Sequence, residues 1–198
     1  MNKVKLLYLH GLESGPYADK AQTLRAADAG EAFEVVAPQL TTARLVALRA
    51  AEPVEGGLAE ALAEPFAQAR AAYLEAEPAV VVGSSFGGAL LLMLVHDPVW
   101  RPETAAVFLA QAGLRLTERA TLPPGVRAVV VHGTDDTVIP VADSRALAAS
   151  SAEAVYVEVT DEHRLQRVTR SGMLTALVRL ALTAPAPVPA PEPAPAVE

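Results

Sequence analysis

Short apolar runs alternate with longer segments of helical spacing along most of the chain, and this alternation is the feature that most limits the possible folds. Several runs are almost continuously apolar, as expected of strands covered on both faces. Strands separated by helices form parallel sheets through right-handed crossovers. The chain therefore predicts an α/β fold, a three-layer α/β/α sandwich with a mostly parallel six-stranded sheet. The expected strands are Val4–Leu9, Phe33–Ala37, Ala79–Val82, Thr104–Leu109, Arg127–Val131 and Ala154–Val159.

The segments between these runs predict helices. The expected helices are Tyr17–Ala27, Leu58–Tyr73, Gly87–Val95, Val141–Ala149 and Leu165–Leu182. Pro65 is expected to start or kink the second of them. The last helix is expected to bury one face, made of Leu165, Val168, Met173, Ala176, Leu177 and Leu180. The stretch Thr41–Gly57 is compatible with a helix or a flap, and its Pro53 and Gly56-Gly57 mark a loop.

The 198 residues suffice for one domain, and we expect it to span residues 1–183. The remaining segment, residues 184–198, is almost entirely Pro and Ala and holds six of the sixteen prolines. Such a segment has few backbone donors and little apolar surface to bury, so we expect a disordered tail. A rigid spacer or docking arm is the alternative.

Composition and charge argue against several function classes. The net charge is −7, and the 16 basic residues are scattered among 23 acidic ones, so nucleic acid is not an expected partner. The absence of cysteine excludes disulfides, a thiolate nucleophile and zinc–thiolate sites. No apolar run approaches the ~18 residues of a membrane span, and Leu6–Leu9 is too short for a signal-peptide core. We therefore expect no membrane association and a cytoplasmic location.

The strongest local motif is Gly83-Ser84-Ser85-Phe86-Gly87, which has the form G-x-S-x-G. An apolar strand precedes it and an apolar helix follows it, which is the context the motif requires for a serine nucleophile. Glycines two residues before and two residues after Ser85 leave space for the strained turn. The backbone N–H of Phe86 then begins a helix, where it can stabilise a developing oxyanion. The alternative is a tight turn that only packs strand against helix. Ser84, the other serine of the motif, does not lie two residues from both glycines and so does not fit the nucleophile position.

A serine nucleophile needs a general base, and the chain has four histidines. His163 lies in a polar loop after the last strand, where a parallel sheet presents its functional loops, and we predict it to be the base. The alternative for His163 is an exposed loop residue. His10 is expected to shape the loop after the first strand, and His96 to end a helix. His132 is expected to be a buried, hydrogen-bonded residue.

A carboxylate should orient the base, and two candidates follow the fifth strand, Asp135 and Asp136. Either could supply the acid, or the pair could cap a loop. In both cases the order along the chain is Ser, Asp, His. This order is typical of α/β hydrolases and differs from those of trypsin-like and subtilisin-like enzymes.

Over residues 3–182 the chain resembles the α/β-hydrolase superfamily, and most of all the small, lidless bacterial esterases that include the YqiA-like group. The motifs that carry the resemblance are Tyr8-Leu-His-Gly-Leu-Glu-Ser-Gly-Pro16 with Lys20-Ala21, Gly-Ser-Ser-Phe-Gly-Gly and the later Asp-Glu-His-Arg-Leu165. The resemblance implies that the first two strands of the larger enzymes are missing and that the strand order is 2-1-3-4-5-6. It assigns the triad acid to Asp136 and a second oxyanion N–H to Leu12. Asp135 would then be a turn residue or a helper.

Larger members insert a cap after the strand equivalent to Thr104–Leu109. Here about seventeen residues separate that strand from the next, so we expect no cap and an open site. The apolar residues Leu12, Phe86 and Leu114 suggest a modest apolar acyl pocket.

These observations predict a serine hydrolase that cleaves carboxylic esters through an acyl-enzyme, with no metal and no organic cofactor. Thioesters are the next substrate class, and amides are less expected because a poor leaving group demands closer positioning. The expected partner is thus a small-molecule ester or thioester. A catalytically silent protein that binds a ligand in the same cleft and a cofactor-free perhydrolase are the alternatives. An edge strand would allow pairing with a second copy, but nothing in the sequence requires it.

Overall fold

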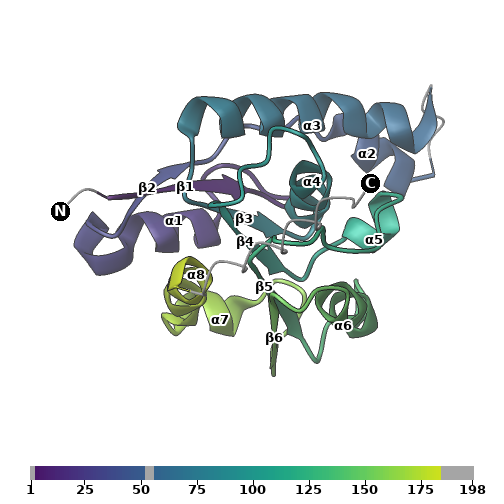
Figure 1. The fold of residues 1–198 in the computed structure, drawn as a ribbon. Coiled ribbons are helices and arrows are strands. Elements are labelled where there is room, and N and C mark those ends of the chain that lie inside the picture. The colour runs from purple at the N-terminus through teal and green to yellow at the C-terminus, as the bar shows by residue number, and fades with distance from the viewer. Residues whose placement is uncertain (1–2, 52–55, 184–198) are drawn as a thin grey trace, which may run out of the picture.

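A computed structural model describes residues 3–51 and 56–183 of the chain and contains one six-stranded sheet, with every pair of neighbouring strands parallel (Figure 1). The strand order is β2-β1-β3-β4-β5-β6, as the resemblance implied. The strands are β1 (Val4–Leu9), β2 (Phe33–Val36), β3 (Val80–Ser84), β4 (Ala105–Leu109), β5 (Ala128–Gly133) and β6 (Ala154–Val159). The predicted fold class is therefore confirmed.

Helices follow the strands along the chain. They are α1 (Asp19–Ala26), the 3-10 turn η1 (Ala27–Gly30), α2 (Ala43–Arg49), α3 (Gly57–Ala76), α4 (Phe86–Val95), α5 (Gly113–Leu116), α6 (Val141–Ala149), α7 (Gln166–Arg170) and α8 (Met173–Thr183). Of the helix or flap that the sequence allows for residues 41–57, the structure has a helix, α2, while Pro53 of that stretch lies outside the described residues.

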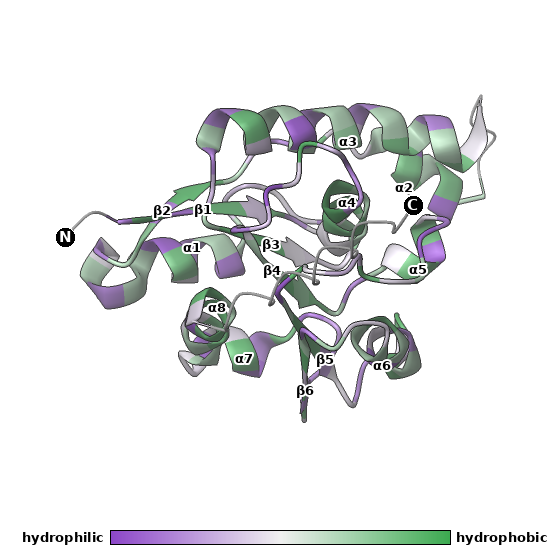
Figure 2. Cartoon of the chain, viewed as in Figure 1, coloured by the Kyte–Doolittle hydropathy of each residue, from purple (hydrophilic) through white to green (hydrophobic). Residues whose placement is uncertain are grey.

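The helices cover both faces of the sheet because successive strand residues point to opposite faces. On one face, Leu7 and Leu9 of β1 belong to the cluster that includes buried residues of α2, α3, α4 and α6. On the other face, Leu6 and Tyr8 pack with α1, α7 and α8. Figure 2 shows the consequence for α4, whose residues are almost all hydrophobic. All of them except Met93 are buried.

The expected single helix Leu165–Leu182 is wrong, because the chain forms two helices, α7 and α8. Gly172 separates them with φ +80°, a left-handed conformation that suits glycine and ends a helix. The break also changes the buried face. Met173 and Leu180 are 41% and 39% exposed, and Ala176 is also exposed. The buried positions of α8 are instead Leu174, Leu177, Val178 and Ala181.

Pro65 does not start α3, because the helix begins at Gly57 and continues across the proline. A proline removes one helical hydrogen bond, and here the buried side chain packs in the same helix face as Ala61 and Ala69. Packing of a twenty-residue helix on the sheet therefore outweighs the local preference of one residue.

The segment between β4 and β5 contains only the four-residue α5, so no cap covers the sheet edge within the described chain. No helix in residues 3–51 or 56–183 combines the length and the apolar character needed to cross a membrane. The predicted tail, residues 184–198, lies outside the described residues, and the proposed domain boundary stays a prediction.

The strand order places a topological switch between β1 and β3. The helix after β1 lies on one face of the sheet and the helix after β3 lies on the other. In open parallel sheets, ligands bind beyond the carboxyl ends of the strands at such a switch. The loops after β1 and β3 are thus expected to contribute to a site.

Candidate active site

Ser85 lies in the turn between β3 and α4, with φ 53° and ψ −112°. A positive φ is rare for a residue with a side chain, and such strained residues gather at functional sites. The neighbouring glycines permit the turn. A Cβ on Gly87 would lie 2.0 Å from the Leu9 carbonyl oxygen, and one on Gly83 would lie 2.5 Å from the Gly87 carbonyl oxygen. Both contacts are with backbone, so the turn requires glycine at these two positions.

Three side chains from different loops meet beside this turn. His163 Nδ1 lies 2.8 Å from Asp136 Oδ2, and His163 Nε2 lies 2.9 Å from Ser85 Oγ. Because an ionised carboxylate only accepts, Nδ1 carries the proton and donates it to Asp136. Nε2 is then free to accept the Ser85 hydroxyl proton. The structure therefore brings together the three residues that the sequence predicted, in the arrangement that acyl transfer by serine requires.

The Asp136 side chain is fully buried, and its environment supplies donors to both oxygens. The N–H groups of Val138 and Ile139 donate to Oδ1 at 2.8 and 2.9 Å, and His163 donates to Oδ2. Burial by itself raises the pKa of Asp136. The hydrogen bonds from Ile139, His163 and Val138, with the charge of His163, outweigh burial and lower the pKa. Asp136 is therefore ionised at neutral pH and can stabilise an imidazolium.

His132 is a second histidine on the same carboxylate, a contact that the sequence did not predict. It is buried, as expected, and its Nε2 lies 2.9 Å from Asp136 Oδ2 and 3.0 Å from the Ile139 carbonyl oxygen. Its Nδ1 lies 2.7 Å from Ser144 Oγ. Both Nε2 partners accept, so Nε2 carries a proton. The spacing of four residues between His132 and Asp136 in the loop after β5 is the signal that might have indicated this contact.

The rings of the other two histidines make their hydrogen bonds with partners other than the serine. His10 is fully buried, donates through Nδ1 to the Gly11 carbonyl at 2.8 Å and accepts the Leu40 N–H at Nε2. Burial lowers the pKa of His10, which holds it neutral and consistent with the expected role in shaping the loop. His96 ends α4 and bonds the Thr121 carbonyl.

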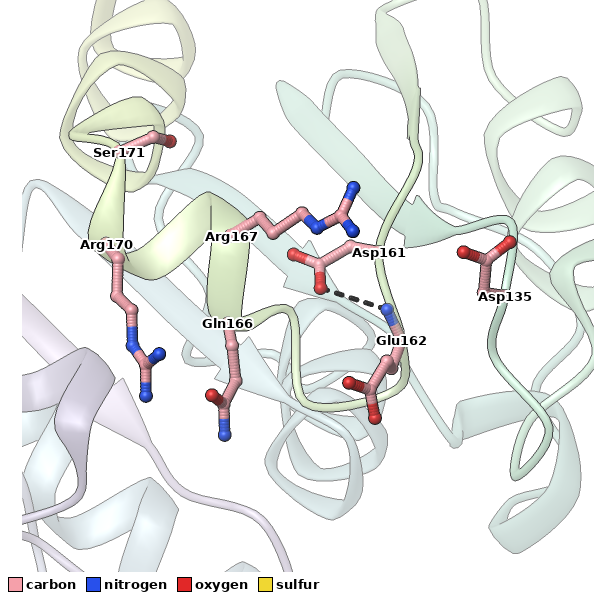
Figure 3. Close-up of a pocket in the computed structure, with 7 residues that line it drawn as sticks. All are labelled: Asp135, Asp161, Glu162, Gln166, Arg167, Arg170 and Ser171. Atoms are coloured by element: carbon pink, nitrogen blue, oxygen red, sulfur yellow. Dashed lines mark hydrogen bonds between the residues drawn. The ribbon is translucent and has the colours of Figure 1, made fainter.

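Asp135 is the rejected alternative for the acid, and it faces another cavity. Its carboxylate accepts a hydrogen bond from Thr134 and not from His163. Figure 3 shows Asp135 together with the other residues that line this cavity, with Asp161 and Glu162 lying between Asp135 and α7. They are Asp161, Glu162, Gln166, Arg167, Arg170 and Ser171.

The two predicted oxyanion residues flank the serine. A Cβ at Gly11 would lie 3.6 Å from Ser85 Cβ, so the loop that carries Leu12 passes directly beside the nucleophile turn. Phe86 is the first residue of α4, where a backbone N–H has no partner within the helix. Both N–H groups therefore come from segments that adjoin Ser85.

A cleft adjoins the Leu12 loop and is lined by Leu12, Glu13, Val46, Arg49 and Ala50. It differs from the expected acyl pocket. The Phe86 ring is 1% exposed and belongs to the core, and Leu114 packs against that same core. The apolar wall of the cleft is instead formed by Leu12 and by Val46 of α2. Among the described residues, no group of three His, Asp or Glu side chains is arranged to hold a metal ion.

Solved structures share this fold. One is a protein from Xanthomonas campestris pv. campestris assigned as a hydrolase of the alpha/beta superfamily; it is 28% identical, with a TM-score of 0.60 over 90% of this chain and 98% of the other. A serine hydrolase from Cycloclasticus zankles is 15% identical, with a TM-score of 0.63 over 90% and 89%. Dienelactone hydrolase from Anabaena variabilis is 19% identical, with a TM-score of 0.59 over 92% and 85%. No family model and no curated protein sequence matches the chain.

The sheet order and the turn at Ser85 are those of the α/β-hydrolase fold, and the fold extends over almost the whole length of the Xanthomonas protein. The chain belongs to the α/β-hydrolase superfamily. The Xanthomonas protein, at 28% identity, is assigned as a hydrolase, and this similarity supports a hydrolytic activity.

Proposed function

We propose that this protein is a serine hydrolase that cleaves carboxylic esters, with Ser85 as nucleophile, His163 as general base and Asp136 as the orienting acid. The chain of hydrogen bonds from Ser85 Oγ through His163 to Asp136, at 2.9 and 2.8 Å, carries this proposal. The small, lidless esterases are the branch that we propose for it, on the motifs that the sequence shares with them.

In the proposed reaction, His163 Nε2 takes the proton of Ser85 as its oxygen attacks the ester carbonyl. The N–H groups of Leu12 and Phe86 stabilise the oxyanion. His163 then gives the proton to the alkoxide as the alcohol leaves, and an acyl-serine remains. Water, deprotonated by His163, attacks the acyl-serine, and the carboxylic acid leaves as Ser85 recovers its proton.

The cleft beside Leu12 indicates which class of substrate the site favours. One wall is apolar, from Leu12 and Val46, and the site has no cap in the described chain. An open cleft with a small apolar wall favours short acyl esters that are already reactive. It gives little help to an amide, whose poor leaving group needs tighter positioning.

A fluorophosphonate probe tests the nucleophile directly, because it reacts only with an activated serine. We expect one adduct, located on Ser85 by peptide mass spectrometry. Ser85→Ala should abolish it, whereas Ser84→Ala, a substitution of the adjacent serine, should keep it. Turnover of p-nitrophenyl esters from acetate to octanoate should then be fastest for the short chains.

Other outcomes would assign the site differently. Faster turnover of matched thioesters than of esters would make the protein a thioesterase, and a rate that requires peroxide would make it a perhydrolase. A folded protein without adduct and without turnover would contradict the proposal and favour a ligand-binding role.

A further inference from the structure

The loop that carries His163 spans Asp161–Arg164, and backbone contacts hold its first residue against β5. The Asp161 carbonyl oxygen accepts the Asp135 N–H at 3.1 Å. A Cβ on Gly133 would lie 2.2 Å from the same oxygen, so the loop lies directly on the end of the strand. This contact fixes the start of the loop but leaves the residues after it to other restraints.

The Asp161 side chain ties the loop to α7. It is 4% exposed, and its carboxylate accepts the N–H groups of Glu162 at 2.9 Å and Val168 at 3.0 Å. Figure 3 shows the bond from the Glu162 N–H and the Asp161 side chain on the side of the loop that faces α7. A buried negative charge therefore stands two residues before His163.

Arg164, the residue after His163, is held by Lys20 of α1, a helix that is distant in the sequence. Lys20 Nζ donates to the Arg164 carbonyl oxygen at 2.5 Å, across 144 positions of the chain. Lys20 is half-buried, and its charge is attracted by Asp161 and by Asp19 of its own helix and repelled by Arg164. A single ammonium group thus acts on both ends of the His163 loop.

We propose that Lys20 is a positioning residue for the general base: its ammonium group holds the Asp161–Arg164 loop so that His163 reaches Ser85 and Asp136 together. This role rests on the proposed function. The two hydrogen bonds of His163 are 2.8 and 2.9 Å long, and both depend on where the loop places the imidazole. A displacement of about 1 Å in a reacting group can slow a reaction by about a hundredfold.

The environment of Lys20 makes the restraint sensitive to pH. Burial lowers the pKa of Lys20 to about 8, against the opposing attraction of Asp161 and Asp19. Below this pH the ammonium is charged and attracts Asp161. Above it the amine is neutral and only the hydrogen bond to Arg164 remains, so the loop is held less tightly.

The test compares Lys20→Met, Lys20→Arg and a control, Lys5→Met, which removes an exposed lysine from β1. Turnover of p-nitrophenyl acetate is followed from pH 6 to 10, and urea denaturation shows that each variant is folded. We expect Lys20→Met to lower kcat about ten- to hundredfold with KM within about twofold. Lys20→Arg should restore most of kcat and move the alkaline limb of the profile above pH 9, because a guanidinium stays charged.

Two results would overturn this role while the proposed function stands. One is a folded Lys20→Met with the kcat of Lys5→Met. The other is a Lys20→Arg that keeps the wild-type alkaline limb, which would make Lys20 a structural residue. A wild-type protein without ester turnover or probe adduct would instead overturn the proposed function, and the role of Lys20 with it.

Discussion

At the scale of single residues, the carboxylate of Asp136 is the most constrained group in the site. It accepts from the N–H groups of Val138 and Ile139 and from His163, and His132 Nε2 lies 2.9 Å from its Oδ2. A buried charge is costly unless donors compensate it, and three donors do so here. The Asp136 side chain is therefore both the orienting group for His163 and a point of folding stability.

The contact between His132 and Asp136 leads to the first prediction. His132→Phe removes the imidazole that lies 2.9 Å from Asp136 Oδ2 and leaves the Ile139 carbonyl without its donor, while keeping a ring of similar shape. Ile139 also donates its N–H to Asp136, and leaving its part-buried carbonyl without a partner costs about 1–3 kcal/mol, so kcat/KM for p-nitrophenyl acetate should fall about five- to hundredfold. Ser144→Ala is the matched control, since it removes the partner of the other ring nitrogen, and it should lose less. Full activity of a folded His132→Phe would show that His132 does not support Asp136.

The lowered pKa of Asp136 leads to a prediction about stability. Because the folded protein holds this pKa below its ordinary value of about 3.9, the carboxylate stabilises the fold above that pH and loses this contribution as the pH falls. Asp136→Asn does not titrate. The wild-type protein should exceed the variant in free energy of unfolding at pH 7 by more than it does at about pH 3.5.

Urea denaturation of both proteins at the two pH values measures this difference. A gap that stays constant, or that widens in acid, would mean that the hydrogen bonds to Asp136 do not favour its charged form.

At the scale of elements, the turn between β3 and α4 shows why the serine can project from the sheet edge. Gly87 lies against the carbonyl of Leu9 on β1, and Gly83 lies against Gly87 itself. The turn is therefore braced by the neighbouring strand as well as by its own glycines. The positive φ of Ser85 persists because this packing leaves the backbone no room to relax.

Gly87→Ala tests this bracing. A Cβ 2.0 Å from a backbone oxygen must push α4 away from β1, so the variant should lose about 1–3 kcal/mol or more of stability and should not label with a fluorophosphonate. Gly15→Ala is the control, because the nearest atom to its Cβ would be 3.9 Å away. A Gly87→Ala protein with normal labelling and stability would show that the turn is looser than its packing indicates.

At the scale of the whole molecule, two layers of helices enclose a sheet whose carboxyl edge presents every loop of the site. The loops after β1, β3, β5 and β6 supply Leu12, Ser85, Asp136 and His163 in turn. The buried residues of the helices on the two faces belong to the core clusters. A substitution there should change stability before it changes the chemistry.

The predicted domain boundary can be tested on this scale. A chain that ends at Thr183 should keep its urea midpoint and its rate of fluorophosphonate labelling, since the site and both core clusters lie within the described residues up to that point. Circular dichroism with denaturant and a labelling time course measure the two quantities. A truncated protein that unfolds at lower urea or labels more slowly would show that residues 184–198 contribute to the domain.

The sequence by itself determined the strands, the fold class and the three residues that meet at the site. Continuous apolar runs such as Ala79–Val82 predict buried parallel strands because such strands are covered on both faces. The observed β3 begins one residue later and ends two residues later than this predicted strand. Parallel strands bring their following loops to one edge, so the order Ser85, Asp136, His163 was enough to predict their meeting. Asp136 was separated from Asp135 by the family resemblance, not by the local pattern.

The tertiary structure decided which side chains support that site and which face of the last helix is buried. The contacts of His132 with Asp136 and of Lys20 with Arg164 depend on how loops and helices pack, and no periodicity along the chain encodes them. The break at Gly172 has a local signal, the glycine itself, but the tertiary structure decides which face is buried after it, because Leu174 and Val178 and not Met173 and Leu180 pack in the core. Local patterns specify elements through nearby residues, whereas the fine geometry of the site comes from residues far apart in sequence and forced together by the core.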